Sequence, residues 1–453
     1  MNKFSSIILA AGQGTRMKSE KCKVMHKISS KPLIKWVYEK AKKAGSGKTV
    51  MVVGHKKEQV MEYMGPDELY AVQEQRLGTG HAVMMTKEFF KDDDGIVVVF
   101  NGDTPLISDK LISDLVEYHK KSGNAATVVS AVVDNPFGYG RVIKLSDGSL
   151  VKIVEQKDAS EEEKKVCEIN SGMYCFNTKD LFDALSKIKN DNAQGEYYLT
   201  DTISVLKGEN KKVGAFVAPD YKEILGVNNR VDLAAAQKIK NDEIITKNMI
   251  AGVTIIDPQN TYIDDEVIIG SDTIIYPGSI IRGKTVIGSD CEIGPSSTLD
   301  DTVIGNGTTF KNSVAINAKI GDNTTVGPFA YIRPNSDIKN NVKIGDFVEV
   351  KNSVIGNGTK VSHLTYVGDS DVGEKINFGC GTITVNYDGK NKFRTVIEDN
   401  AFIGCNTNLV APVKVGKGAF IAAGSTITDD VDDNALAIAR SRQTVKKDWR
   451  KKN

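Results

Sequence analysis

The C-terminal half of the chain places an aliphatic residue at every sixth position over long stretches. The first unbroken run is Ile263, Ile269, Ile275, Ile281, Ile287, Ile293 and Leu299. After shifts of phase, two further runs are Ile320, Val326, Ile332, Ile338, Ile344 and Val350, and then Ile397, Ile403, Leu409, Val415, Ile421 and Ile427. A period of six fits neither a helix, which repeats every ~3.6 residues, nor an open strand, which repeats every ~2.

Six residues suit one short strand and one tight corner, with a single side chain pointing inward. Three such units close a coil, and stacked coils bury the aliphatic positions as one column. Glycine often follows the inward residue, as in Ile287-Gly288 and Ile344-Gly345, where its conformational freedom suits a corner. The pattern predicts a rigid β-helix of hexapeptide repeats. It leaves open a column that serves only as a spacer or an assembly device.

The N-terminal half follows a different pattern, in which short apolar runs alternate with helical periodicity up to about residue 229. Residues 6–9 and 96–100 are such runs, typical of buried strands in a parallel sheet. The alternation predicts a doubly wound, Rossmann-like α/β domain over residues 1–229. Residues 230–250 lack Gly and Pro and predict a linker helix capped by Asn229. The β-helix and a basic tail would then occupy residues 251–453.

Candidate chemistry in the first half begins where the first predicted strand ends. That strand enters the turn Ala10-Ala11-Gly12-Gln13-Gly14-Thr15-Arg16-Met17, after which a helical pattern begins. Small residues at such a turn let backbone N–H groups approach phosphate oxygens, although this turn matches neither the dinucleotide fingerprint nor the Walker motif. Arg16 and Lys23 add two cations suited to a polyphosphate. Asp103, at the end of the second run, is either a strand-end cap or a Mg²⁺ ligand.

Composition narrows the possible partners. The 59 basic and 58 acidic residues give a net charge of +1, which predicts neither a nucleic-acid-binding nor a membrane-binding surface. The chain has no apolar run of about 18 residues, so no transmembrane helix is expected. The six cysteines have no zinc-ligand spacing, and we expect reduced thiols in a cytoplasmic protein.

A polar cluster marks the β-helix at about its middle, where Arg333, Glu349, Lys351, His363 and Tyr366 fall within about two coils. The chain has only five histidines, and a lone one is usually structural, but this cluster favours catalysis. Glu349 precedes His363 by 14 residues, so one coil could bring the two together. The period then breaks after Phe378, which predicts an extruded loop around residues 384–391. Because one convex column has no deep pocket, a site here requires an oligomer.

Taken together, the motifs of the first half resemble the signature of sugar-nucleotide pyrophosphorylases. The resemblance rests on residues 9–17, Lys23, Gln73, Gly78-Thr79, Gly102-Asp103, residues 138–141, Glu155, Asn170, residues 194–198 and residues 226–229. Joined to the hexapeptide half, the whole chain resembles the bacterial bifunctional N-acetylglucosamine-1-phosphate uridylyltransferases/glucosamine-1-phosphate acetyltransferases. The resemblance implies a left-handed parallel β-helix and two activities that make UDP-N-acetylglucosamine for peptidoglycan and lipopolysaccharide-type polymers.

For uridylyl transfer, the resemblance assigns a role to each matching residue. UTP would be held by Leu9, Ala10, Ala11, Gly12, Gln73, Gly78 and Thr79, its phosphates by Arg16 and Lys23, Mg²⁺ by Asp103 and Asn228, and the sugar by Gly140, Glu155 and Asn170. The sugar phosphate would attack the α-phosphorus of UTP in line. Cys22 and Asn101 depart from the family pattern, which often has Pro and an aromatic residue there, but neither departure removes a charge.

For acetyl transfer, the resemblance makes His363 the general base, with Glu349 supporting its orientation, and Arg333 and Lys351 the clamp for the sugar phosphate. Contacts to the glucosamine or the oxyanion would come from Tyr366, Asn377, Asn386 and Tyr387, and the acetyl-CoA channel from Cys380, Cys405 and Ala423, with Arg440 beyond. Cys380 and Cys405 stand where Ala and Ser are common, so thiol modifiers should inhibit. The family packs as homotrimers, and the sequence leaves open a hexamer of paired trimers.

Two alternatives to the bifunctional enzyme remain. In one, a hexose-1-phosphate nucleotidylyltransferase carries a β-helix that only assembles or regulates it, which the His363 cluster disfavours. In the other, the chain is a non-catalytic exchange-factor subunit of similar layout. That alternative predicts decay of the phosphate turn and the metal carboxylate, yet Gly12, Gly14, Arg16, Lys23 and Asp103 are all present.

Overall fold

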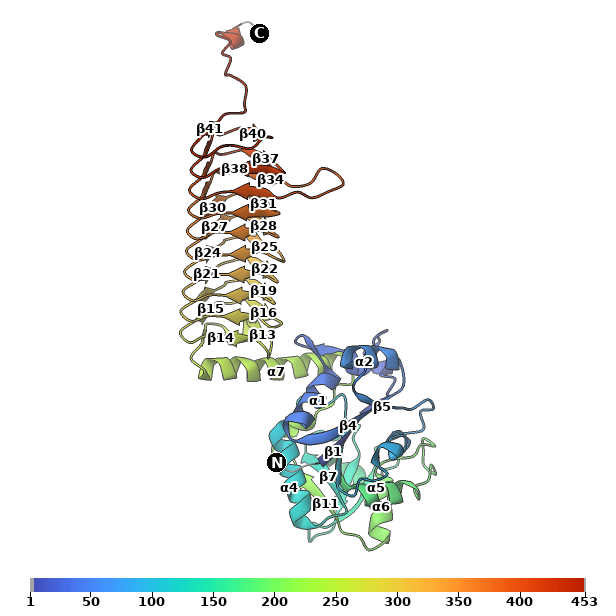
Figure 1. The fold of residues 1–453 in the computed structure, drawn as a ribbon. Helices are drawn as coiled ribbons and strands as arrows, with labels where there is room; N and C mark the ends of the chain where they lie inside the picture. The colour runs from blue at the N-terminus through green and yellow to red at the C-terminus, as the bar shows by residue number, and fades with distance from the viewer. Residues whose placement is uncertain (1–3, 452–453) are drawn as a thin grey trace. The chain divides into compact units, whose positions relative to one another are not determined.

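The computed structural model of the protein describes residues 4–451, and the chain folds into two compact units, Met1–Lys240 and Asn241–Asn453. Helix α7 (Arg230–Ile250) contains the boundary between them (Figure 1). Within the first unit, Leu233 and Ala236 of this helix pack with Trp36. Within the second, Ile244 and Ile245 join the core of the coil. The division therefore falls inside the segment predicted to be a linker helix.

The first unit is built around one mixed sheet. Its main strands, in spatial order, are β11 (Val213–Val217), β7 (Ala126–Val132), β10 (Glu168–Asn177), β6 (Ile96–Asn101), β1 (Phe4–Ala10), β4 (Ser46–Val53) and β5 (Leu69–Val72). In addition, β8 (Arg141–Lys144) pairs with β10, and β9 (Leu150–Val154) pairs with β8. The central strand β1 runs parallel to both β4 and β6, whereas β10 is antiparallel to β6. The two apolar runs identified from the sequence are β1 and β6, which confirms the prediction of an α/β domain.

Helices and turns complete this unit. The α-helices are α1 (Leu33–Lys43), α2 (Lys57–Met64), α3 (Thr79–Met84), α4 (Asp109–Ser122), α5 (Thr178–Leu185) and α6 (Asp201–Gly208). The shorter elements are η1 (Thr15–Met17), η2 (Lys23–Met25), the pair β2 (Lys27–Ile28) and β3 (Lys31–Pro32), η3 (Lys87–Phe90), η4 (Glu163–Lys165) and η5 (Tyr221–Ile224). The helix expected directly after Met17 is wrong, because Lys18 adopts a left-handed φ of 47°, which ends η1 after one turn.

The second unit is a left-handed parallel β-helix with three faces, as predicted (Figure 1). The first face holds β12 (Thr254–Ile255), β15 (Ile274–Ile275), β18 (Glu292–Ile293), β21 (Thr309–Phe310), β24 (Thr325–Val326), β27 (Lys343–Asp346), β30 (Lys360–His363), β33 (Asn377–Phe378), β36 (Phe402–Ile403), β39 (Phe420–Ile421) and β41 (Leu436–Ala437). The second face holds β13 (Tyr262–Ile263), β16 (Ile280–Arg282), β19 (Thr298–Asp300), β22 (Val314–Ile316), β25 (Tyr331–Ile332), β28 (Glu349–Lys351), β31 (Tyr366–Gly368), β34 (Ile383–Val385), β37 (Asn408–Val410) and β40 (Thr426–Ile427). The third face holds β14 (Ile268–Ile269), β17 (Val286–Ile287), β20 (Val303–Ile304), β23 (Lys319–Ile320), β26 (Asp337–Ile338), β29 (Val354–Ile355), β32 (Ser370–Val372), β35 (Thr395–Ile397) and β38 (Val413–Val415).

The aliphatic residues of the six-residue period line the interior of the coil. Ile275, Ile281, Ile293 and Leu299 have no exposed surface, and each packs against its equivalents one coil away. Burying an aliphatic side chain of this size stabilises by about 1.5–3 kcal/mol. Small hydroxyl residues fill the corners and satisfy the backbone there, as when Thr273 Oγ1 donates to the carbonyl of Gly288 at 2.8 Å. The repeat therefore specifies both the core and the spacing of the outward side chains.

Two segments leave the regular coil. The chain between β34 and β35 forms the predicted extruded loop, closed by an antiparallel bridge between Tyr387 and Lys392 (Figure 1). The tail beyond β41 leads to η7 (Trp449–Lys451), and η6 (Pro258–Asn260) lies near the start of the coil. Across residues 4–451, no helix has the length and apolar character needed to cross a membrane.

Two candidate active sites

The first candidate site is a pair of adjoining hollows at the carboxyl ends of β1 and β6. One, of about 510 Å³, is lined by Leu9, Ala10, Ala11, Gly12, Lys23, Gln73, Gly78, Thr79 and Asp103. The other, of about 440 Å³, is lined by Arg16, Asp103, Gly140, Glu155, Asn170 and Asn228. Asn101 and Asp103 border both hollows. All residues that the sequence assigned to the nucleotide, the metal and the sugar thus lie around one continuous depression.

Lys23 lines the first of these hollows and contacts Asp103, which borders both. Its ammonium group donates to the Asp103 carboxylate and to the side-chain oxygen of Asn228, the latter at 2.8 Å. Gly14 makes the arrangement possible, since its φ is 62° and an added Cβ would lie 2.6 Å from Cβ of Lys23. Arg16 donates to the same Asn228 oxygen at 2.9 Å. Two cations and two oxygen ligands therefore converge where phosphates would be expected.

The same geometry fits a Mg²⁺ site. The oxygens of Asp103 and Asn228 both reach one ammonium nitrogen, so both could reach one metal ion. Backbone bonds fix the two ligands: Val227 N donates to the carbonyl of Asp103 at 2.9 Å, and Asn228 N donates to Asp232 at 2.9 Å. Within residues 4–451, no three His, Cys, Asp or Glu side chains cluster to hold a metal. A site with two protein oxygens suits Mg²⁺, which usually keeps waters and phosphate oxygens as its other ligands.

The wall of the nucleotide hollow is held by a second strand-to-helix turn. Gly78 has a φ of 104°, and an added Cβ would lie 2.6 Å from the carbonyl of Tyr197. Gln73 donates to the carbonyl of Gly78 at 3.1 Å, and the Thr79 hydroxyl accepts from Leu199 N at 3.1 Å. This packing leaves the turn no freedom to shift. The amide of Gln73 and the backbone of the turn are therefore preorganised as hydrogen-bonding groups.

Glu155 lies in the second hollow beside Gly140. A Cβ on Gly140 would come within 3.4 Å of both carboxylate oxygens, so glycine keeps this space open. Burial raises the pKa of Glu155, and the nearby carboxylates of Asp158, Asp201 and Glu196 raise it further. Asn170 lines the same hollow, and its side-chain oxygen accepts from Gly172 N at 2.9 Å. A partly buried carboxyl group and an amide fit recognition of sugar hydroxyl groups.

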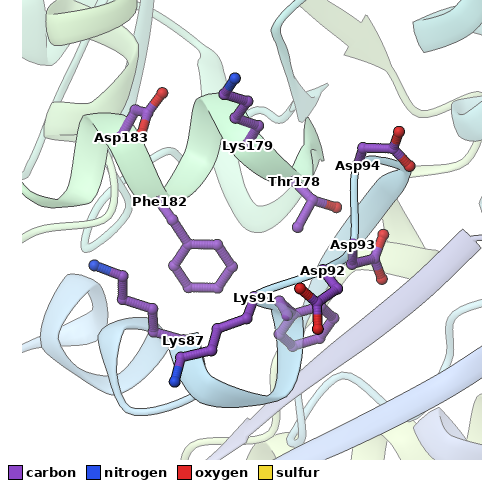
Figure 2. A pocket seen from close by; sticks show the side chains of 10 residues that line it. Lys87, Lys91, Asp92, Asp93, Asp94, Thr178, Lys179, Phe182 and Asp183 are labelled. Carbon is purple, nitrogen blue, oxygen red and sulfur yellow. The ribbon is translucent and has the colours of Figure 1, made fainter.

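A further hollow of about 510 Å³ lies between η3 and α5 and contains none of the predicted residues (Figure 2). Figure 2 shows the ring of Phe182 directed into it from α5, with lysine and aspartate side chains around the rim. Part of this rim is already committed, because Asp93 accepts from the Ser5 hydroxyl and from Gly95 N, both at 2.9 Å. No convergent set of free polar groups marks it as a site for chemistry.

The second candidate site lies on the coil, at the corner that follows the first face. Asp346 and His363 are register partners on β27 and β30, and Nδ1 of His363 lies 2.7 Å from Oδ1 of Asp346. Glu349 was expected to orient His363, but within this chain the carboxylate in contact with the imidazole is that of Asp346. The coil here advances by 17 residues, so position 346 faces 363, whereas Glu349 faces Tyr366.

Glu349 instead belongs to a cationic cluster on the second face. Its carboxylate accepts from Arg333 at 2.7 Å. Nearby, Lys351 lies 3.8 Å from the buried carboxylate of Asp369. Arg333, Lys351, Asp369 and Lys392 line a hollow of about 330 Å³. The predicted phosphate clamp is thus brought together, and it gains Lys392 from the extruded loop, which the sequence reasoning did not select.

Asp369 is a second residue that the sequence did not reveal. Asn386 donates to its carboxylate, and Asn352 does so at 2.5 Å. Burial acts to raise the pKa of Asp369, but these hydrogen bonds and the charge of Lys351 outweigh it and lower the pKa below its usual value. Asn386 also approaches the Tyr366 hydroxyl at 3.4 Å. Asp369 therefore links the loop to the coil, and only its corner position before β32 hinted at this.

The remaining predicted residues are more widely spread. Cys380, Cys405 and Ala423 continue the corner column of Asp346 and His363, as the pairings of Val361 with Phe378, Phe378 with Ile403, and Ile403 with Ile421 require. Arg440 lies next to that column, with Cδ 3.7 Å from a Cβ built on Gly424. Asn377 begins β33 three positions before the corner, and Tyr387 sits on the extruded loop, its hydroxyl donating to the carbonyl of Gly389 at 2.7 Å.

Comparison with known proteins agrees with both halves. The Nucleotidyl transferase family matches residues 5–229, and the Bacterial transferase hexapeptide family (six repeats) matches residues 266–301, 317–352 and 394–429. These matches and the two sites define a two-domain transferase, a nucleotidyltransferase joined to a hexapeptide acyltransferase.

Relatives that match over the full length of the chain identify its family within this class of transferases. "Bifunctional protein GlmU" of Acetivibrio thermocellus is 57% identical over 449 residues, covering 99% of this chain and 97% of that protein. The proteins of the same name from Caldanaerobacter subterraneus subsp. tengcongensis and a Geobacillus species are 57% and 54% identical, each covering 99% of this chain and 98% of their own. The chain belongs to the family of bifunctional GlmU proteins and is a bifunctional uridylyltransferase and acetyltransferase.

Proposed function

We propose that the first unit transfers UMP from UTP to N-acetylglucosamine-1-phosphate and releases pyrophosphate. The observation that carries this proposal is the convergence of Lys23, Arg16, Asp103 and Asn228 between a nucleotide-sized and a sugar-sized hollow. Lys23 and Arg16 hold the phosphates of the two substrates in line, and Gln73 and the turn at Gly78 orient the uridine. Mg²⁺, held by Asp103 and Asn228 when bound, supplies charge neutralisation at the phosphates. No protein nucleophile takes part.

The sugar half of the depression supports the choice of acceptor. Glu155 and Asn170 present oxygens beside the open space at Gly140, as binding of a hydroxylated and amidated ring requires. Asp103 borders both hollows, so the ligand of the metal stands between the two reacting groups. Positioning and electrostatic stabilisation then provide the rate enhancement.

For the second unit, we propose acetylation of glucosamine-1-phosphate by acetyl-CoA. Arg333, Lys351 and Lys392 form a cationic hollow suited to the sugar phosphate. Nε2 of His363 accepts a proton from the substrate amine, whose nitrogen then attacks the thioester carbonyl. Asp346 holds the imidazole through Nδ1, and Tyr366, Asn386, Tyr387 and Asn377 contact the sugar or the oxyanion. Cys380, Cys405, Ala423 and Arg440 border the path of the acyl-CoA.

An apolar strip beside the same corner supports assembly into an oligomer. Phe329, Phe347 and Leu364 form an outward apolar ladder directly beside Asp346 and His363, with exposed fractions of 58%, 58% and 57%. The two phenylalanine rings stack with centroids 5.5 Å apart. Such a strip is costly to leave in water, and a second copy packed against it would also enclose the catalytic corner. We propose a homotrimer, alone or as paired trimers, in the cytoplasm, where six unpaired thiols remain reduced.

The decisive experiment is a pair of variants measured in both half-reactions. His363→Ala should lower acetyl transfer by about 10²–10⁴-fold, the usual loss on removing a general base, and leave uridylyl transfer unchanged. Asp103→Ala should lower uridylyl transfer and leave acetyl transfer unchanged. A folded His363→Ala protein with normal acetyl transfer would favour a β-helix that acts only as a scaffold.

A further inference from the structure

Cys380 and Cys405 occupy equivalent corner positions in two successive coils. Phe378 pairs with Ile403, Gly379 N donates to the carbonyl of Ile403 at 2.7 Å, and Asn406 N donates to the carbonyl of Cys380 at 2.7 Å. Parallel strands in register lie about 4.8 Å apart. Two cysteines can be bridged when their Cα atoms are about 4.4–6.8 Å apart. The spacing of the coils therefore matches what a disulfide needs.

These two thiols are also accessible, unlike most others in the chain. Cys380 is partly exposed and Cys405 is exposed. Cys22, Cys175 and Cys291 are buried, and burial raises the pKa of each of these three thiols, which suppresses the reactive thiolate. Cys167 is the third thiol with exposure, but it belongs to the first unit. An oxidant in solution thus meets one pair of neighbouring thiols and one isolated thiol.

The position of the pair connects it to chemistry. One coil before Cys380, the same corner carries His363, and one coil earlier it carries Asp346. Glycines flank both thiols on the first face: a Cβ on Gly379 would lie 2.4 Å from Cys405 N. Glycine at this position therefore lets successive coils approach closely beside the thiols. The segment between the two cysteines contains Lys392, which lines the sugar-phosphate hollow, and Asn386, which donates to Asp369 of that hollow.

We propose that Cys380 and Cys405 are a reversible oxidation site, and that their disulfide blocks acetyl transfer. The proposal rests on the acyl-CoA path proposed above for this corner. With oxidised glutathione as oxidant, the Cys405 thiolate attacks one of its sulfurs and releases one glutathione thiolate. The Cys380 thiolate then attacks the Cys405 sulfur of the mixed disulfide and releases the second. Two protein thiols lose two electrons and two protons, and one low-molecular-weight disulfide becomes two thiols.

The test uses the full-length protein, treated with oxidised glutathione, alkylated and digested for mass spectrometry, with both activities measured on the same sample. We expect a peptide pair joined through Cys380 and Cys405, a loss of acetyl transfer of about tenfold or more, unchanged uridylyl transfer, and recovery with dithiothreitol. Cys380→Ala and Cys405→Ser should each retain their acetyl transfer after treatment with oxidised glutathione, each compared with the same variant untreated. Cys167→Ser, the matched control, should remain as sensitive as the parent.

The outcomes separate the thiol chemistry from the location of the acetyl-transfer site. Glutathione adducts on single cysteines, with no joined peptide, would show that Cys380 and Cys405 do not form a disulfide, even if acetyl transfer declined. A joined peptide with full acetyl transfer would overturn the blocking effect and count against an acyl-CoA path at this corner. A joined peptide whose formation tracks the loss of acetyl transfer in time supports the proposal.

Discussion

The Nδ1 atom of His363 lies 2.7 Å from Oδ1 of Asp346, its register partner one coil earlier. The hydrogen bond from the imidazole lowers the pKa of Asp346, so the carboxylate stays ionised at neutral pH. Occupying Nδ1 in this way fixes the ring and the tautomer that leaves a lone pair on Nε2. The contact therefore orients a half-exposed histidine in the way that the base role proposed for it requires.

The first prediction concerns Asp346 as a positioning residue. Asp346→Ala should lower kcat of acetyl transfer by roughly 10- to 100-fold, because the imidazole loses the acceptor that fixes its ring and tautomer. Asp346→Asn keeps an acceptor for Nδ1–H and should recover part of the loss. KM for glucosamine-1-phosphate should change little in either variant, since Arg333 and Lys351 remain. Steady-state acetyl transfer, measured with free coenzyme A as the readout, checks the ranking.

The matched control for this series is Asp337→Ala, which removes a carboxylate paired with Lys339 at 2.6 Å on a different face of the coil. It should leave both activities intact. Equal kcat in Asp346→Ala and the parent would show that the contact has no part in catalysis.

The second prediction concerns Asp103 and the metal. Asp103→Asn should raise the Mg²⁺ concentration needed for half-maximal uridylyl transfer by at least tenfold, because a neutral amide is a weaker ligand for a hard cation. Acetyl transfer should be unaffected. A Mg²⁺ titration of uridylyl transfer tests this. An unchanged midpoint would show that Asp103 is not a Mg²⁺ ligand.

The third prediction concerns the boundary of the first unit. Leu233, Ala236 and Ile239 of α7 pack in the cluster around Trp36, and Asp232 accepts from Asn228 N. A fragment of residues 1–250 should therefore keep uridylyl transfer. A fragment of residues 1–229 should melt at a lower temperature, since it loses the apolar side chains of α7 that pack against this cluster. Thermal unfolding of the two fragments decides this, and equal Tm values would show that α7 adds no stability.

The fourth prediction concerns the pH dependence of stability at Asp369. Its pKa is lowered in the folded protein, so its contribution to stability is present above the unfolded pKa of about 3.9 and is lost as pH falls through the folded pKa. Asp369→Asn should therefore lower the Tm of the β-helix most at neutral pH, with a difference that shrinks toward pH 3. Scanning calorimetry across this range measures it. A difference independent of pH would mean that charge is irrelevant at this position.

Local patterns in the sequence were sufficient for most of the architecture. The buried column followed from a six-residue repeat, because each unit is one strand and one corner regardless of the rest of the chain. Asp103 was identifiable because it follows the end of β6, where parallel sheets gather polar groups, and Lys23 because it is a cation that follows the glycine-containing turn after β1. These are features that a short stretch of chain specifies by itself.

Side-chain contacts between successive coils could not be predicted from local sequence patterns. Glu349 precedes His363 by only 14 residues, whereas one coil advances the chain by 17 residues here, so Asp346 rather than Glu349 lies against the imidazole. Asp369 and Lys392 were missed because their roles depend on how the extruded loop folds back, which no periodicity encodes. A helix was predicted directly after Met17, but the left-handed backbone conformation of Lys18 ends the helical turn there.

The central claim is that one chain carries two independent transfer sites that act in succession. Incubating the purified protein with glucosamine-1-phosphate, acetyl-CoA, UTP and Mg²⁺, and analysing the products by mass, tests it most directly. The account predicts N-acetylglucosamine-1-phosphate as an intermediate and UDP-N-acetylglucosamine, coenzyme A and pyrophosphate as products. Formation of UDP-N-acetylglucosamine only when the acetylated sugar phosphate is supplied would contradict it and leave the β-helix without a catalytic role.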